Sequence, residues 1–187
     1  TADNLGIIYI WNTENWHIAK TLSGHEGAVN SIDFSIDGKY LATAGRDKTI
    51  KIWNTTSGGQ IRSLYGHDDQ VKDVIFTKDG KYIISASNAQ TVRIWDTSTY
   101  REINQLKGHR GVVNALAFNG SNNQVASASE DHTIIFWDLN SDRQVKQLSG
   151  FASFVNVVKY SADMRVIGMG NQGGYIKIID AASGNCL

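Results

Sequence analysis

Short apolar segments that alternate with polar residues recur along the whole chain. Between residues 29 and 53, for example, the segments VNSIDF, KYLATA and TIKIW alternate or run apolar over five or six residues. They are rich in Val, Ile, Thr and Tyr, and this pattern predicts β-strands rather than helices. The segments between them are rich in Gly, Asp, Asn and Ser, which predicts tight turns.

This pattern repeats with a fixed period of 42 residues. Gly-His pairs begin at Gly24, Gly66 and Gly108, and the next step falls on Gly150, where the histidine is replaced by Phe151. The tryptophans keep the same interval, and the step after the last of them falls on Ile179. A constant period without insertion or deletion indicates a repeat architecture. The tryptophans in register are Trp11, Trp53, Trp95 and Trp137.

Each unit is predicted to contain four short strands, a to d. A Gly-His loop leads into strand a, strand c ends at the tryptophan, and a polar turn leads to strand d. The pairs Asp37–Gly38 and Asp79–Gly80 between strands a and b predict type I′ hairpin turns, which require positive φ. Four-stranded units of about 40–45 residues are typical of a β-propeller, in which neighbouring blades cover the faces that one sheet cannot bury alone.

These motifs resemble the WD-repeat β-propeller family over essentially the whole chain. Trp95–Asp96 and Trp137–Asp138 match the dipeptide that gives the family its name. Trp11–Asn12 and Trp53–Asn54 carry the Asn variant, and Ile179–Asp180 keeps only the Asp. The resemblance implies an all-β propeller of four-stranded antiparallel blades.

The resemblance also implies a hydrogen-bond network in each full unit. A histidine before strand a contacts a hydroxyl on strand b, which contacts the indole of strand c, while an Asp in the b–c turn holds the histidine. Ala89 replaces this Asp in the second unit. The residues in these places are His25, Thr43, Asp47 and Trp53, then His67, Ser85 and Trp95, then His109, Ser127, Asp131 and Trp137.

The last unit carries none of these polar groups. It has Phe151, Met169, Gly173 and Ile179 in their places, so we expect it to rely on apolar packing.

A hydroxyl, a histidine and a carboxylate could also form a catalytic triad. A nucleophile is needed once per site, whereas this set recurs with the period of the fold and includes a tryptophan that a triad does not use. We therefore interpret the set as structural and predict a protein that is not an enzyme. The five histidines and single cysteine show no metal-ligand spacing, so no metal or cofactor is predicted.

The resemblance implies a peptide-binding surface at the end of the propeller that carries the Gly-His loops. Its contacts come from the third and fifth residues after the histidine and from the residue before the turn Asp. Arg46 and Lys72, on adjacent blades, suggest an acidic or phosphorylated partner segment, and Phe154 suggests an aromatic anchor. The candidates are Ala28, Asn30, Arg46, Gln70, Lys72, Asn88, Val112, Asn114, Glu130, Phe154, Asn156 and Gln172.

Charge and composition narrow the class of partner. Eighteen basic residues balance eighteen acidic ones, which disfavours nucleic acid as a partner. Apolar runs are too short to insert into a membrane. Cys186 is the only cysteine, which favours a reducing, intracellular compartment, either cytoplasm or nucleus.

The repeats divide the chain into five units and 17 expected strands, a little over four blades. Propellers of this family usually close with roughly seven blades. We therefore expect an incomplete arc of a seven-bladed or larger propeller, whose remaining blades come from the same polypeptide. A four-bladed ring closed by the N-terminal strand d, or association of two copies, are the alternatives. The units are 1–22 (strands c and d), 23–65, 66–107, 108–149 and 150–187, the last without its outer strand.

The sequence thus predicts a non-catalytic protein–protein interaction scaffold within a multiprotein assembly, with no small-molecule substrate. The alternative is a regulatory or sensor propeller of a larger enzyme, such as a nucleotide-driven switch or a kinase.

Overall fold

The computed structural model describes all 187 residues and contains seventeen β-strands and no helix. The strands form five separate antiparallel sheets, of two, four, four, four and three strands in chain order. Within each sheet, strands that follow one another in the sequence lie side by side. The prediction of an all-β chain with 17 strands in four-stranded units is confirmed.

The strands keep the order that the repeat predicts. The leading sheet contains β1 (Ile7–Trp11) and β2 (Ile18–Ser23). The first full blade contains β3 (Val29–Phe34), β4 (Tyr40–Gly45), β5 (Ile50–Asn54) and β6 (Gln60–Leu64). The second contains β7 (Val71–Phe76), β8 (Tyr82–Ser87), β9 (Thr91–Asp96) and β10 (Glu102–Lys107). The third contains β11 (Val113–Asn119), β12 (Gln124–Ser129), β13 (Ile134–Asp138) and β14 (Arg143–Leu148), and the last blade contains β15 (Val155–Tyr160), β16 (Val166–Asn171) and β17 (Ile176–Asp180).

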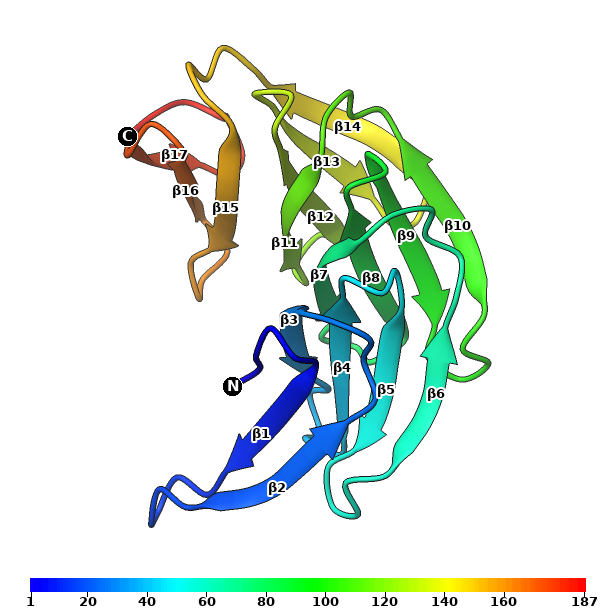
Figure 1. Cartoon of the computed structure of the whole chain (residues 1–187). Coiled ribbons are helices and arrows are strands. Elements are labelled where there is room, and N and C mark those ends of the chain that lie inside the picture. Colours follow the sequence, from blue (N-terminus) through cyan, green and yellow to red (C-terminus); the bar gives the residue numbers. More distant parts are fainter.

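The five sheets stand next to one another in an arc that is open on one side (Figure 1). Strands β3, β7, β11 and β15 lie toward the inner side of the arc, and β6, β10 and β14 form its outer rim. Each inner strand contacts the inner strand of the next blade. The two chain termini belong to the sheets at opposite ends of the arc.

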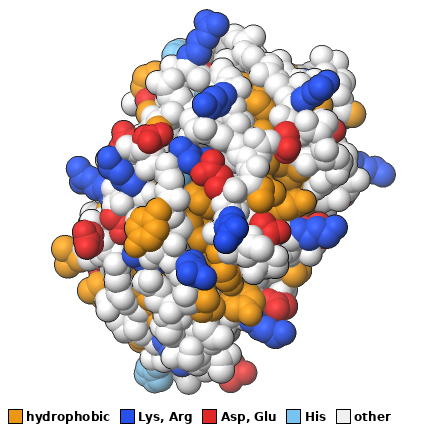
Figure 2. Space-filling view, turned by 90° about the vertical axis from the view of Figure 1, so that its right-hand side faces the viewer, with side chains coloured by type: hydrophobic (Ala, Val, Ile, Leu, Met, Phe, Trp, Pro, Cys, Tyr) orange, Lys and Arg blue, Asp and Glu red, His pale blue; other side chains and the backbone are white.

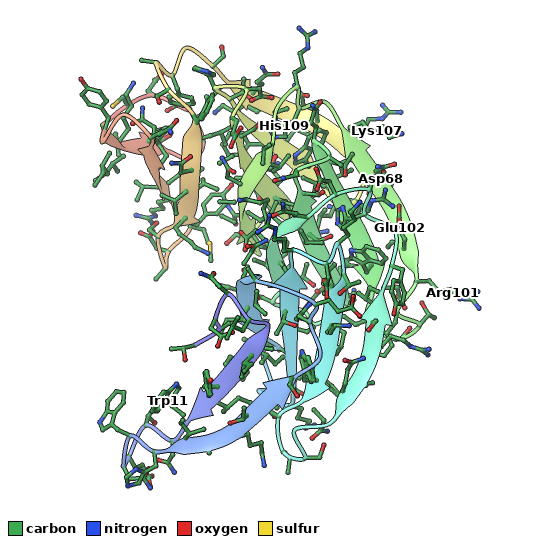
Figure 3. The ribbon with its side chains drawn as sticks, viewed as in Figure 1. Trp11, Asp68, Arg101, Glu102, Lys107 and His109 are labelled. Carbon is green, nitrogen blue, oxygen red and sulfur yellow. The ribbon has the colours of Figure 1, made fainter.

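The hydrophobic core lies between the blades rather than within one of them. Four clusters of buried side chains each join two neighbouring sheets. Each buried tryptophan belongs to the cluster shared with the preceding sheet: Trp53 is in the cluster that contains Ile8 of β1, and Trp137 is in the cluster that contains Ile94 of β9. Trp11, at the open end of the arc, has no such neighbour and is 40% exposed (Figure 3).

The last blade packs against the third blade through apolar side chains. Phe151, Met169 and Ile179 belong to the cluster that joins these two blades. The sequence predicts such apolar packing for a unit that lacks the hydrogen-bond network. Its other face has no neighbour, so Ile176 on β17 is 81% exposed and Ile178 is 51% exposed.

The turns between strands a and b differ from the prediction. Gly38 and Gly80 have positive φ (69° and 72°), but Asp37 and Asp79 do not, so the type I′ assignment is wrong. The N–H of Gly38 instead donates to the carbonyl of Ser35, so the glycine is the last residue of the turn rather than one of its two central residues. The carboxylate of Asp37 accepts bonds from the Ser35 hydroxyl (2.7 Å) and the Lys39 N–H (3.1 Å), and these bonds hold the aspartate in an ordinary conformation.

Two aspartates on the inner strands join neighbouring blades. Asp73 Oδ1 accepts a hydrogen bond from the Ser31 hydroxyl (2.6 Å) in the preceding blade, and Oδ2 accepts one from the Leu116 N–H (2.7 Å) in the next. Asp33 Oδ2 accepts a bond from the Phe76 N–H (2.7 Å). Partly buried acceptors of this kind satisfy donors that would otherwise be costly to bury, so they help to fix how the blades stack.

Candidate functional site

The first full blade brings its four predicted network residues together. His25 Nδ1 lies 2.9 Å from Asp47 Oδ2, and His25 Nε2 lies 2.6 Å from Thr43 Oγ1. The indole N–H of Trp53 donates to the same hydroxyl oxygen over 2.9 Å. The Gly-His loop, β4, the b–c turn and β5 are thereby tied to one another.

The third blade repeats this geometry. His109 lies 2.8 Å from Asp131 and 2.7 Å from the Ser127 hydroxyl, to which Trp137 donates over 2.8 Å.

The protonation states in these networks suit structural hydrogen bonds. Burial lowers the pKa of His25 and His109, and the adjacent carboxylates only partly oppose this. Burial acts against ionisation of Asp47, but hydrogen bonds from Thr49, the Glu26 N–H and His25 still hold its pKa below the usual value. At neutral pH each set therefore combines a neutral imidazole with a carboxylate.

The hydroxyls of these networks are not placed to attack a substrate. Thr43 and Ser127 are fully buried, and each hydroxyl oxygen already accepts an indole N–H bond. A nucleophile must reach a substrate atom at close range, which neither hydroxyl can do.

The second blade keeps only part of the network. His67 Nε2 lies 2.6 Å from the Ser85 hydroxyl, and the indole N–H of Trp95 donates to that hydroxyl over 2.9 Å. Ala89 offers no carboxylate, and His67 Nδ1 has no hydrogen-bond partner. Burial and the nearby positive charge of Arg93 lower the pKa of His67 to about 3.

The predicted partner-binding positions gather at one end of each blade. In every blade, the N–H of the residue before the turn Asp position donates to the carbonyl of the third residue after the histidine position, over 2.8–3.0 Å. The two candidate positions are therefore direct neighbours. The pairs are Arg46 with Ala28, Asn88 with Gln70, Glu130 with Val112, and Gln172 with Phe154.

A hollow of about 500 Å³ lies at this end of the arc, and every residue that lines it is one of the twelve candidates. Five candidates lie outside this hollow: Ala28, Arg46, Gln70, Asn88 and Val112. The structure thus places Lys72 in the hollow without Arg46. The lining residues are Asn30, Lys72, Asn114, Glu130, Phe154, Asn156 and Gln172.

Two of the lining asparagines also hold the blades together. The side-chain amide of Asn30 donates to the carbonyl of Val71 (2.8 Å), and that of Asn114 donates to the carbonyl of Val155 (3.2 Å). Each bond crosses to the next blade, so these two amides have structural partners. The sequence pattern did not reveal this role, because it depends on how neighbouring blades stack.

Some other side chains that line the hollow are not engaged in bonds between blades and are available to bind a ligand. None of the seven ion pairs in the structure involves Lys72 or Glu130. Phe154 is half-buried, with the ring of His132 edge-on at 5.4 Å between centroids. The hollow therefore presents a cation, an anion and an aromatic ring beside several amides.

Sequence reasoning missed a second hollow, of about 360 Å³, at the other end of the inner strands. Its lining is mostly apolar, with Lys78 and Lys159 among the polar members. Four aromatic residues contribute, one from the end of each inner strand. Their regular 42-residue spacing was the signal that could have revealed the hollow: Phe34, Phe76, Phe118 and Tyr160.

The face that carries the outer strands shows no concentration of one charge. On the side that carries the outer strands, Lys and Arg side chains are interspersed with Asp and Glu, with apolar side chains between them (Figure 2). The chain contains no group of three or more His, Cys, Asp or Glu side chains that could hold a metal ion. It also contains no apolar helix of membrane-spanning length.

Comparison with known proteins agrees with the repeat. The family described as "WD domain, G-beta repeat" matches three stretches of the chain, residues 16–54, 58–96 and 100–138. Each stretch ends with the residue that follows the strand-c tryptophan.

Several curated proteins are similar to part of the chain. A p21-activated protein kinase-interacting protein 1-like from Gallus gallus is 39% identical over 46 residues, which are 25% of this chain and 12% of that protein. A Periodic tryptophan protein 2 homolog from Caenorhabditis elegans is 48% identical over 44 residues, 24% of this chain and 5% of that protein. A DDB1- and CUL4-associated factor 13 from Dictyostelium discoideum is 39% identical over 46 residues, 25% of this chain and 10% of that protein. The aligned stretches thus span only a small part of each relative.

Proposed function

The chain belongs to the WD domain, G-beta repeat family, and we propose that it is a non-catalytic scaffold that binds segments of partner proteins within a multiprotein assembly. The proposed binding surface is the hollow at the Gly-His end of the arc. Like other sites on rigid scaffolds, this surface is built from loop and strand-end residues that regular strands hold in place.

One observation carries this proposal: the seven residues that line the hollow all occupy positions at which the family resemblance implies partner contacts. They come from four neighbouring blades, so the surface is wider than any one repeat. Amide side chains can exchange hydrogen bonds with a peptide backbone, and a half-buried aromatic ring can anchor an apolar side chain.

The names of two relatives point in the same direction. One is called a kinase-interacting protein and another an associated factor, and both names describe association with other proteins. We propose the same class of role for this chain, without transferring those particular partners. We further propose an intracellular location, in the cytoplasm or nucleus, which the single exposed thiol of Cys186 supports.

The charge in the hollow favours a partner segment that is acidic or phosphorylated. Lys72 lines the hollow and forms no ion pair, so its ammonium group is available to an anionic side chain. Arg46 is exposed and lies outside the hollow, so any contribution from it would be made at longer range.

Affinity capture of partners from a cell extract tests the proposal. Lys72→Glu and Phe154→Ala, which alter the hollow, are compared with Lys78→Glu, which alters the opposite end of the inner strands. We expect the two hollow variants to lose captured proteins that the wild type and Lys78→Glu retain, with all variants showing cooperative thermal unfolding. Partners that are retained by the hollow variants and lost by Lys78→Glu would show that the other end binds them.

A further inference from the structure

The second full blade contains all the unpartnered buried side-chain polar atoms of the chain. There are three of them: His67 Nδ1, Thr91 Oγ1 and Arg93 Nε. Buried polar groups without a partner are rare in native structures, and each one needs an explanation. Two of these three atoms surround the place where the other full blades have an aspartate carboxylate.

The equivalent carboxylate in the first blade accepts several hydrogen bonds. Asp47 Oδ2 accepts from the Glu26 N–H (3.0 Å) and lies 2.9 Å from His25 Nδ1, while Oδ1 accepts from the Thr49 hydroxyl (2.7 Å). Asp131 has the same set of partners in the third blade.

In the second blade, Ala89 ends at its Cβ atom, but the three donors remain. They are the His67 ring, the Thr91 hydroxyl and the N–H of Asp68, the counterpart of Glu26.

The backbone of the second blade keeps the shape that surrounds a carboxylate. Gln90 follows Ala89 with a φ of 65°, and the corresponding residues Lys48 and His132 have φ values of 67° and 66°. The N–H of Gln90 donates to the Ser87 carbonyl over 3.2 Å, and the same bond measures 3.3 Å in the other two blades. The turn backbone therefore has the same conformation with alanine as with aspartate at this position.

The proton on the His67 ring can be assigned from its other neighbour. The Ser85 oxygen accepts the Trp95 N–H, and unlike Thr43 and Ser127 the Ser85 hydroxyl makes no hydrogen bond to a backbone carbonyl. Its proton is therefore donated to His67 Nε2, 2.6 Å away. The neutral ring then carries its own proton on Nδ1, so the groups around the space are all donors.

Arg93 brings a positive charge close to this position. Arg93, which replaces Lys51 of the first blade, lies close enough to His67 to lower the pKa of that ring together with burial. Its guanidinium is paired with Glu102 (2.6 Å) and Asp68 (3.3 Å), which lie near one another on the outer side of the blade (Figure 3). These pairs hold Arg93 in place, and their two negative charges exceed its single positive charge, so the hydrogen-bond donors, rather than the local charge, favour a carboxylate ligand.

We propose that this position in the second blade binds a carboxylate group, which takes the place of the side chain that Ala89 lacks. The missing part of an aspartate is one carbon and two oxygens, the heavy atoms of formate. The side chains of Asp47 and Asp131 are only 9% and 10% exposed in the other blades, so a ligand at this position would be largely enclosed. The carboxylate can belong to a free small anion or to an acidic side chain of a partner protein.

Thermal unfolding with sodium formate, against sodium chloride at equal ionic strength, tests this site. Formate should raise the Tm of the wild type by about 2–4 °C, the shift typical of a modest stabilisation in a chain of this size. Ala89→Asp supplies the carboxylate covalently, so it should be more stable in chloride and show no formate response. Asp131→Ala opens the same space in the third blade and should gain a second response.

A direct signal from the His67 ring makes the test independent of whether the variants fold. In the wild type, formate should change the ¹⁵N shifts of this imidazole and raise its pKa, as a carboxylate partner does. Equal behaviour in formate and chloride, or a formate response that Ala89→Asp shares, would overturn the proposal. A space occupied by water alone would give the first of these results.

One further ligand separates the sources of the carboxylate. If free small anions are the ligands, formate should bind more tightly than N-acetyl-aspartate methylamide, which resembles an acidic side chain within a peptide. The reverse order assigns the site to a partner's acidic side chain. Loss of protein partners in the Lys72→Glu variant is a separate measurement, so either proposal can fail without the other.

Discussion

The carboxylate of Asp73 accepts a hydrogen bond from the N–H of Leu116 in the next blade, with 2.7 Å between Oδ2 and N. Its other oxygen accepts the Ser31 hydroxyl of the preceding blade, so one side chain joins three blades. Burial raises the pKa of Asp73, and these bonds oppose the rise. The neighbouring Asp33 joins only two blades, through the N–H of Phe76.

Replacing Asp73 should therefore destabilise the chain more than replacing Asp33. Asp73→Ala leaves a buried N–H and a hydroxyl without an acceptor, and each such group costs about 1–3 kcal/mol. Asp33→Ala leaves only one N–H, that of Phe76, without an acceptor. Urea unfolding of both variants measures the difference, and equal losses would show that the inter-blade bonds of Asp73 contribute little.

The histidines of the three full blades should differ in their contribution to stability. His109→Ala removes a partner from both Asp131 and Ser127, whereas His67→Ala removes a partner from Ser85 alone. We expect His109→Ala to lower the free energy of unfolding by about 1–3 kcal/mol more than His67→Ala. The comparison is made by urea unfolding in chloride buffer. A larger loss for His67→Ala would contradict the assignment of its Nδ1 as unpartnered.

His67 should contribute to the destabilisation of the chain by acid, as should His25 and His109, whose pKa values burial also lowers. The folded pKa of His67 is about 3, below its ordinary value of 6.5, so between these values the unfolded state binds a proton that the folded state does not. Stability then falls as the pH is lowered from 6.5 toward 3 and is recovered on raising it. Ala89→Asp should reduce the slope, because its carboxylate raises the folded pKa of His67. Unfolding free energies between pH 7 and pH 4 provide the measurement, and an unchanged slope in Ala89→Asp would argue against this source of acid sensitivity.

Charge reversal should separate binding from stability. Lys72→Glu should weaken binding of an acidic partner segment about tenfold, which is about 1.4 kcal/mol, without lowering the Tm. Arg46→Glu, outside the hollow, should have a smaller effect on affinity. His25→Ala should show the opposite behaviour, with lower stability and unchanged affinity per folded molecule. If Lys72→Glu and Arg46→Glu both left the affinity unchanged, the proposed acidic or phosphorylated segment would be wrong.

The sequence was most informative about contacts within one repeat. The strands and their order follow from local alternation and turn residues, and the spacing of His25, Thr43 and Trp53 relates neighbouring strands of one sheet. The seven residues of the hollow are also among the sequence candidates, because the family resemblance implies partner contacts at their positions in each repeat.

Contacts between repeats could not be predicted from the sequence in the same way. The amides of Asn30 and Asn114 and the carboxylate of Asp73 find their partners on another blade, at a distance that depends on how the sheets stack. The Asp37–Gly38 turn was assigned to the wrong type because the Ser35 hydroxyl engages the aspartate. A dipeptide pattern does not include that competition between side chain and backbone.

The hydrogen bonds that join the inner strands have a consequence for how the chain folds. The bonds made by Asn30, Ser31, Asp33, Asp73 and Asn114 to the next blade all connect groups 41 to 43 residues apart. The sequence separation of the contacts between two neighbouring blades therefore stays the same as blades are added. Bringing each new blade against the previous one costs the same loop-closure entropy. The rate at which a blade joins the arc should depend on a single repeat, so that blades can assemble in succession as the chain leaves the ribosome.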